Sequence, residues 1–197
     1  MQWICFAIRP LTLGELRYAM AVDADSPFKS LVECRNAPEY AETNEDMERR
    51  LKDLCRGLAE IKQHENERVV QFIHQSVNDF LVSDGLRILD NSLKSKDITV
   101  GRAHFQLSRS CLKYIAMEEI GYRLDGMAST DLPSKSFGRY AAKSWPLHSE
   151  IAEAKGIPQG DLLNFLQCPS NEILRRCKRI CDDDDYYSGH FKSGMVL

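Results

Sequence analysis

The fold is decided by residues 69–80, which read Val69-Val70-Gln71-Phe72-Ile73-His74-Gln75-Ser76-Val77-Asn78-Asp79-Phe80. The first half is rich in β-branched and aromatic residues and predicts a strand, which pairs with the alternating run 58–62 across a polar turn at 64–68. The second half predicts a short helix, because Ser76 can cap its start and Asp79 supplies a carboxylate three residues later. A two-stranded hairpin therefore leads directly into a helix.

Two helices are predicted near the N-terminus. Apolar residues recur at helical spacing over 2–8 until Arg9-Pro10 ends the pattern, because a residue before proline avoids the helical region. We expect this segment to be the end of a helix that begins earlier. Thr12 and Glu15 can form a capping box for the second helix, at 13–20.

A third helix is predicted at 45–56, where apolar residues share one face and Gly57 follows as the stop signal. We expect the preceding stretch, 23–44, to be a loop. The order helix, helix, helix, hairpin, helix is the layout of a winged-helix module. We expect Leu16 and Phe72 in its core.

The second half of the chain is predicted to be helical, at 102–120, at 137–154 with an interruption at Pro146, and at 159–180 with a break at Pro169. The last stretch begins with four consecutive Asp, and we expect it to be poorly ordered. We therefore predict a mainly α fold. It comprises a winged-helix subdomain with a two-stranded β-hairpin at 1–90, a helical subdomain at 101–181 and an acidic, disordered tail at 182–197.

The composition is that of a globular protein, with 197 residues, 26 Lys and Arg, 29 Asp and Glu, and a net charge of −3. We do not expect nucleic acid as a partner, because nonspecific affinity for it depends on Lys and Arg releasing counterions from phosphates. The longest apolar stretch, Trp3–Ile8, is far shorter than the ~20 residues of a membrane span, so we expect no membrane association. The seven Cys residues include no C-x-x-C pair, and we expect reduced thiols in a cytoplasmic protein.

The sequence lacks the motifs of several enzyme classes. It contains no G-x-x-x-x-G-K-[ST] phosphate loop, no G-x-G-x-x-G, no H-E-x-x-H and no G-x-S-x-G nucleophile elbow. We therefore expect no enzymatic activity, no catalytic residue, no metal site and no cofactor in this chain by itself.

Three strings of sequence carry a family resemblance, and they are WICFAIRPLTLGEL at 3–16, VQFIHQSVNDFL at 70–81 and YAAKSWPLH at 140–148. In this order and spacing they resemble fungal NACHT-type STAND proteins, which are NLR-like signalling ATPases. In that family the first two strings follow the NTPase core, in a winged helix also labelled the GPI inositol-deacylase winged-helix domain. The third lies in the helical segment that leads to ankyrin or other repeats.

The resemblance implies a non-catalytic regulatory module or fragment that transmits the nucleotide state of an NTPase core to a repeat domain. The core would precede Met1 and the repeats would follow Ile180, so ADP or ATP is expected only where an upstream NTPase domain is present. The expected partners are an NTPase (NACHT) domain and a repeat domain, in the same chain or in another, and other proteins. The implied biological setting is fungal innate immunity or heterokaryon incompatibility.

His74 is the candidate binding residue, and two readings of it are open. From spacing alone it ends a half-buried strand, and its ring hydrogen-bonds a local backbone group. The string Phe72-x-His74-x-Ser76-x-x-Asp79-Phe80 is also similar to F-x-H-x-S-x-x-E-F of animal inflammasome-type NLRs, whose histidine touches the β-phosphate of ADP. The resemblance thus implies that His74 senses the ADP phosphate when an NTPase domain is present.

Two alternative functions remain open. The helical half can be the docking surface of an autonomous protein–protein interaction scaffold. A winged helix can also bind DNA, but the helix at 45–56 carries four acidic and four basic residues, and the hairpin turn adds Glu65 and Glu67 against Arg68. Phosphate binding requires a basic surface, so DNA binding is the less favoured alternative.

The remaining candidate groups are interpreted as structural. Trp145, Pro146 and His148 could suggest a site, but Trp145 with Tyr140 and Ala141 fits the packing face of a helix. Cys177 and Cys181 lie one helical turn apart but lack two further metal ligands. The run Asp182–Asp185 lacks the Gly and the terminal Glu of a calcium loop.

Overall fold

The computed structural model describes residues 2–64, 67–85, 88, 96–124, 137–160, 162 and 170–192. The helical segments are, in chain order, α1 (Gln2–Phe6), α2 (Leu13–Ala21), α3 (Leu31–Arg35), α4 (Asn44–Cys55), α5 (Gln75–Phe80), the π-helical turn η1 (Leu81–Gly85), α7 (Lys96–Ala116), α8 (Glu118–Leu124), α9 (Gly138–Ala154) and α10 (Ser170–Lys192). The strands are β1 (Ala59–His64) and β2 (Glu67–Phe72). This order confirms the predicted fold class, a winged-helix arrangement followed by a helical region.

The hairpin has the predicted antiparallel pairing, with Ala59 opposite Phe72 at one end and His64 opposite Glu67 at the other. The segment between α1 and α2 pairs with the hairpin, because the Val70 amide donates to the Leu11 carbonyl oxygen at 2.9 Å. Val70 and Phe72 are buried on the face that meets the helices. The core position expected for Phe72 is therefore confirmed.

Side-chain caps set the ends of the early helices. The Thr12 amide donates to Glu15 (2.9 Å) and the Glu15 amide to the Thr12 hydroxyl (3.2 Å), so the predicted capping box is present. Thr43 and Asp46 form a second capping box, at the start of α4. Arg56 takes the left-handed conformation with φ 49° and ends α4 just before the expected Gly57, whose φ is 85°.

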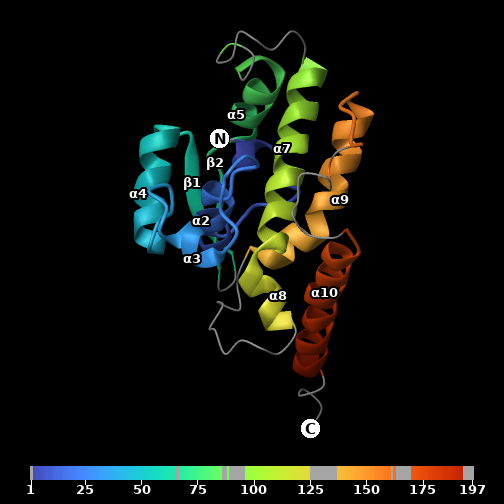
Figure 1. Cartoon of the computed structure of the whole chain (residues 1–197). Coiled ribbons are helices and arrows are strands. Elements are labelled where there is room, and N and C mark those ends of the chain that lie inside the picture. The colour runs from blue at the N-terminus through green and yellow to red at the C-terminus, as the bar shows by residue number, and fades with distance from the viewer. Residues whose placement is uncertain are drawn as a thin grey trace.

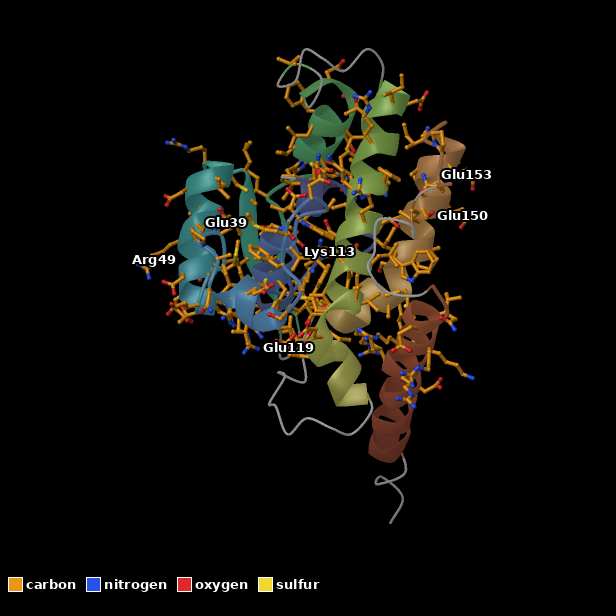
Figure 2. All side chains as sticks on the ribbon, viewed as in Figure 1. Glu39, Arg49, Lys113, Glu119, Glu150 and Glu153 are labelled. Atoms are coloured by element: carbon orange, nitrogen blue, oxygen red, sulfur yellow. The ribbon has the colours of Figure 1, made fainter. Side chains whose placement is uncertain are left out.

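The stretch predicted as one loop, 23–44, contains the short helix α3. Ser30 caps it by accepting from the Glu33 amide at 3.1 Å. Glu119 of α8 also accepts from the Leu31 amide at 2.7 Å and the Val32 amide at 3.2 Å, beside α3 (Figure 2). A carboxylate near a helix start satisfies amides that have no partner inside the helix. The long-range partner explains why sequence reasoning missed α3.

The helical half differs from prediction at five places. The predicted helix 102–120 is divided at Met117 between α7 and α8, and residues 159, 160 and 162 of the predicted helix 159–180 are not helical. Helix α7 begins at Lys96, earlier than 102. Helix α9 continues through Pro146, so the predicted interruption there is wrong, because α9 packs along α7 on both sides of the proline. Helix α10 reaches Lys192, so it extends into the segment that was expected to be a disordered tail from Asp182 onward. The run from Asp182 to Lys192 contains no proline, and an acidic run alone does not break a helix.

Helix α7 lies between the winged-helix elements and the pair α9 and α10 (Figure 1). One hydrophobic core spans both sides of it, and its members include Leu13, Leu16, Met47, Leu51, Leu112, Tyr114, Ile115, Phe137, Tyr140 and Ile173. Burial of this shared core therefore holds the two halves together. Among the described residues, no helix combines the length and the apolar character that crossing a membrane requires.

Candidate functional site

The His74 side chain is exposed and caps the start of α5. Its Nδ1 accepts from the Ser76 amide at 3.1 Å and lies 2.8 Å from the Ser76 hydroxyl. The expectation that the ring bonds a local backbone group is therefore confirmed. The cap itself is His74 and not Ser76, because α5 begins at Gln75, two residues earlier than a Ser76 cap would place it.

This cap fixes the tautomer of His74. A backbone amide can only donate, so Nδ1 is an acceptor and the neutral ring carries its hydrogen on Nε2. Within the described part of the chain, Nε2 of His74 has no hydrogen-bond partner. An exposed ring with a fixed orientation and an available N–H can donate to an anionic oxygen.

His74 lines a groove of about 570 Å³ between α1 and the hairpin. Trp3 and the link residues Ile8, Arg9 and Pro10 form one wall, and the other comes from β2 and α5. Arg9 donates to both carboxylate oxygens of Glu15, at 2.9 Å and 2.5 Å. These bonds raise the pKa of Arg9 above its ordinary value.

Lys62 adds a second cation to the lining of this groove, beside the Glu60 carboxylate at 3.1 Å. Both cations therefore have an acidic neighbour, while His74 supplies an uncharged donor. The groove can hold a small anionic group.

Residues 1–90 match the family model described as GPI inositol-deacylase, winged helix domain. The azaphilone pigments biosynthesis cluster protein L of Monascus ruber is 29% identical over 151 residues. The match covers 74% of this chain and 29% of that protein, so the chain spans less than a third of the relative's length. No solved structure matches the chain significantly.

In the winged-helix arrangement, the helix that would enter DNA is α4, and its basic side chains already have partners on the protein. Lys52 binds Glu48 at 2.9 Å, Arg68 of β2 also binds Glu48, and Arg49 binds Asp46. Cations held by carboxylates on the same surface are poorly placed to contact phosphates. The ion pairs agree with the balanced charge seen in the sequence.

The groups interpreted as structural lie in the helical half. His148 is buried, and Trp145 is partly buried against the shared core. Burial raises the pKa of the Cys177 thiol, which keeps it protonated and unreactive. The described residues hold no cluster of three or more His, Cys, Asp or Glu side chains that could bind a metal ion.

Sequence reasoning missed the hydrogen-bond partners of His148. Its Nε2 lies 2.9 Å from the Tyr140 hydroxyl and its Nδ1 lies 2.7 Å from Nδ1 of His104. His104 is 44 residues away on α7, and no spacing rule connects the two. The only available signal was that histidine is rarely buried without a partner.

Proposed function

We propose that this chain is a non-catalytic regulatory module of a NACHT-type STAND protein. In this role the winged helix reads the nucleotide held by an NTPase domain outside this chain and passes the change to the helical half. A repeat domain beyond the helical half is the expected recipient, in the same chain or in another. The setting is cytoplasmic.

The observation that carries the proposal is the fixed tautomer of His74. The Ser76 amide holds Nδ1, so the Nε2 hydrogen points away from the cap and is available to a ligand. A phosphate oxygen of ADP, brought by an NTPase domain, is a suitable acceptor for it. The match of residues 1–90 to the winged-helix family and the resemblance to NACHT-type proteins support this assignment.

The shared core supports transmission from the winged helix to the helical half. An ADP contact at His74 stabilises whichever arrangement of domains brings the phosphate to the ring. A ligand shifts such an equilibrium only as far as it binds one arrangement better than the other. Because both halves pack on α7, a movement of the winged helix also moves the helical half.

The test joins a NACHT-type NTPase domain ahead of this chain and measures ADP binding by calorimetry. We expect His74→Ala to weaken ADP binding about ten- to hundred-fold, because a hydrogen bond to a charged acceptor contributes roughly 1.5–3 kcal/mol. His74→Asn keeps a good cap but lacks the ring, and it should weaken ADP to a similar extent. His64→Gln, at another exposed histidine, is the control and should bind ADP normally. Unchanged ADP affinity in both His74 variants would refute the sensor role.

The proposal also predicts that the isolated chain hydrolyses neither ATP nor esters, because its sequence has no phosphate loop and no nucleophile elbow. Hydrolysis above a buffer blank is the measurement. Turnover that a single substitution within this chain removes would contradict the prediction.

A second candidate function is an autonomous interaction scaffold, favoured by exposed apolar side chains of the winged helix rather than by the helical half suggested from the sequence. Leu54, Leu58 and Ile73 are all exposed, and the Ile73 amide donates to the Leu58 carbonyl oxygen at 3.1 Å. Neighbouring exposed apolar side chains are typical of protein contact sites. Partner binding that is identical with and without an NTPase domain would favour the scaffold over the nucleotide-linked module.

A further inference from the structure

A chain of hydrogen bonds runs from the link after α1 through α9 to α7, part-buried at Ile8 and buried at the histidines. The Ile8 amide donates to the Tyr140 hydroxyl oxygen at 3.0 Å, and this hydroxyl lies 2.9 Å from Nε2 of His148. Nδ1 of His148 then meets Nδ1 of His104 at 2.7 Å. The exposed fractions are 1% for Tyr140, 0% for His148 and 6% for His104. These groups therefore depend on one another for their hydrogen bonds.

The contact between the two imidazoles constrains their hydrogens. Only one of the two Nδ1 atoms can carry a hydrogen, since the other must accept it. With both rings neutral, His104 and His148 are consequently opposite tautomers. Burial favours this neutral pair and lowers the pKa of His104 to about 4 and that of His148 to about 3.

Tyr140 connects the histidine pair to the wall of the His74 groove. Its hydroxyl holds the Ile8 amide, and the Arg9 guanidinium lies 5.3 Å from the centre of its ring. Trp3 packs edge-on against the same ring at 6.0 Å. All three residues line the groove that contains His74. The position of this wall therefore rests on Tyr140.

Helix α1 also shields the histidines from water. Phe6 packs against the His104 ring at 5.4 Å. If α1 and the link to Pro10 move away from α9, His104 and His148 become accessible to water. An accessible imidazole binds a proton near its ordinary pKa of 6.5, so acid favours the open arrangement.

Other titratable groups around the pair do not supply a compensating negative charge. Those near Tyr140 are Cys111 on α7 and Arg9, whose carboxylate partner is Glu15, while Arg139 and Lys143 of α9 are exposed. Within the described residues, neither ring hydrogen-bonds a carboxylate. A proton added to the closed arrangement therefore remains uncompensated.

We infer that His104 and His148, acting through Tyr140, form a proton-sensitive latch that holds the Ile8–Pro10 link against α9 and maintains one wall of the His74 groove. The closed latch is neutral and the open one is protonated. The latch is independent of nucleotide, so it is tested separately from the proposed sensor role of His74.

The first test is nitrogen-15 NMR of the histidine rings in the full chain. At pH 7 we expect two neutral rings of opposite tautomer that remain neutral to about pH 5. His64, which is exposed on β1, serves as the internal reference. A protonated ring at pH 7, or two identical tautomers for the buried pair, would overturn the latch.

The second test measures hydrogen-exchange protection of the Ile8 amide. We expect protection of this amide to fall as the pH drops from 7.5 to 5. For each histidine ring that opening exposes to water, the protection factor should fall by up to about tenfold for each pH unit below 6.5. Tyr140→Phe should lower Ile8 protection about tenfold at pH 7 and shift the His74 ring resonances, because the amide loses its acceptor.

The matched control is Tyr18→Phe, since the buried Tyr18 hydroxyl bonds Arg35 and not Ile8. It should leave Ile8 protection unchanged. Equal loss of protection in both variants would mean that Tyr140 contributes only general stability. Protection that stays constant across the pH range would also exclude the latch, and that measurement needs only the unmodified chain.

Discussion

The end of the hairpin and the interface of α7 with α9 each hold a histidine, but in opposite environments. His74 is exposed, and its partner is the Ser76 amide two residues away. His148 is fully buried, and its partners are 8 and 44 residues away. Solvent therefore reaches His74, which leaves it available to a ligand.

The difference shows how burial decides what a histidine can do. The packed interface disfavours charge on His148, whereas the His74 ring is open to solvent. His74 is suited to recognition, and His148 is suited to linking the fold to pH. Three predictions test this contrast, and the first concerns the hydrophobic core that the hairpin shares with α7 and α9.

The largest effect is expected for Phe72→Ala. Phe72 is buried in the shared core, and removal of a buried aromatic ring typically lowers the free energy of unfolding by about 3–5 kcal/mol. Because the core is continuous, we expect the helical half to unfold in the same transition. Chemical denaturation followed by circular dichroism and by tryptophan fluorescence measures both.

Ile73→Ala is the control for this prediction, because the neighbouring Ile73 side chain is 49% exposed. It should lower stability by less than about 1 kcal/mol. A loss below about 1 kcal/mol for Phe72→Ala would show that the face assigned to β2 is wrong. Two separate transitions would show that the two halves do not share a cooperative core.

The second effect is the loss of stability in mild acid. The folded pKa values of His104 and His148, about 4 and about 3, lie below the ordinary 6.5, so the unfolded chain binds more protons. Stability should therefore fall as the pH drops through 6.5, by about 2–3 kcal/mol in total between pH 7 and 5.5. Urea denaturation at several pH values measures this.

The control for the acid effect is the double variant His104→Gln/His148→Gln, in which neither side chain can titrate. Its stability should change little between pH 7 and 5.5, while His64→Gln should behave like the unmodified chain. The ion-paired carboxyl of Glu48 has a lowered pKa and loses its contribution only below about pH 4.5. If the double variant keeps the full loss of stability in acid, groups other than His104 and His148 cause that loss.

The sequence predicted those features whose causes are local. Thr12 and Glu15 are three residues apart, so their capping box could be identified from spacing, and the hairpin could be identified from its β-branched run. The local hydrogen bond of His74 was one of two sequence readings, but its exposure was not predicted, because the sequence pattern placed it at the end of a half-buried strand. Short-range chemistry of this kind requires no knowledge of the tertiary structure.

The features that sequence reasoning missed depend on contacts between distant segments. Helix α3 has a local Ser30 cap, but its Leu31 amide depends on Glu119, which is 88 residues away. The pairing of His104 with His148 arises only when α7 packs against α9. At Pro146 the sequence pattern predicted a break that is not present. Proline commonly interrupts helices, but tertiary packing keeps α9 helical through this residue.

The smallest effect separates the two roles of His74, as a helix cap and as a ligand donor. In the isolated chain His74→Ala removes the acceptor of the Ser76 amide, and loss of an N-cap typically costs about 1 kcal/mol. His74→Asn restores a side-chain acceptor, so its stability should lie within a few tenths of a kcal/mol of the unmodified chain. Thermal and urea denaturation measure this difference. If Asn restores stability but not ADP affinity in the chain joined to an NTPase domain, the ring acts as a sensor beyond its capping role. If Asn restores both, the cap alone accounts for His74.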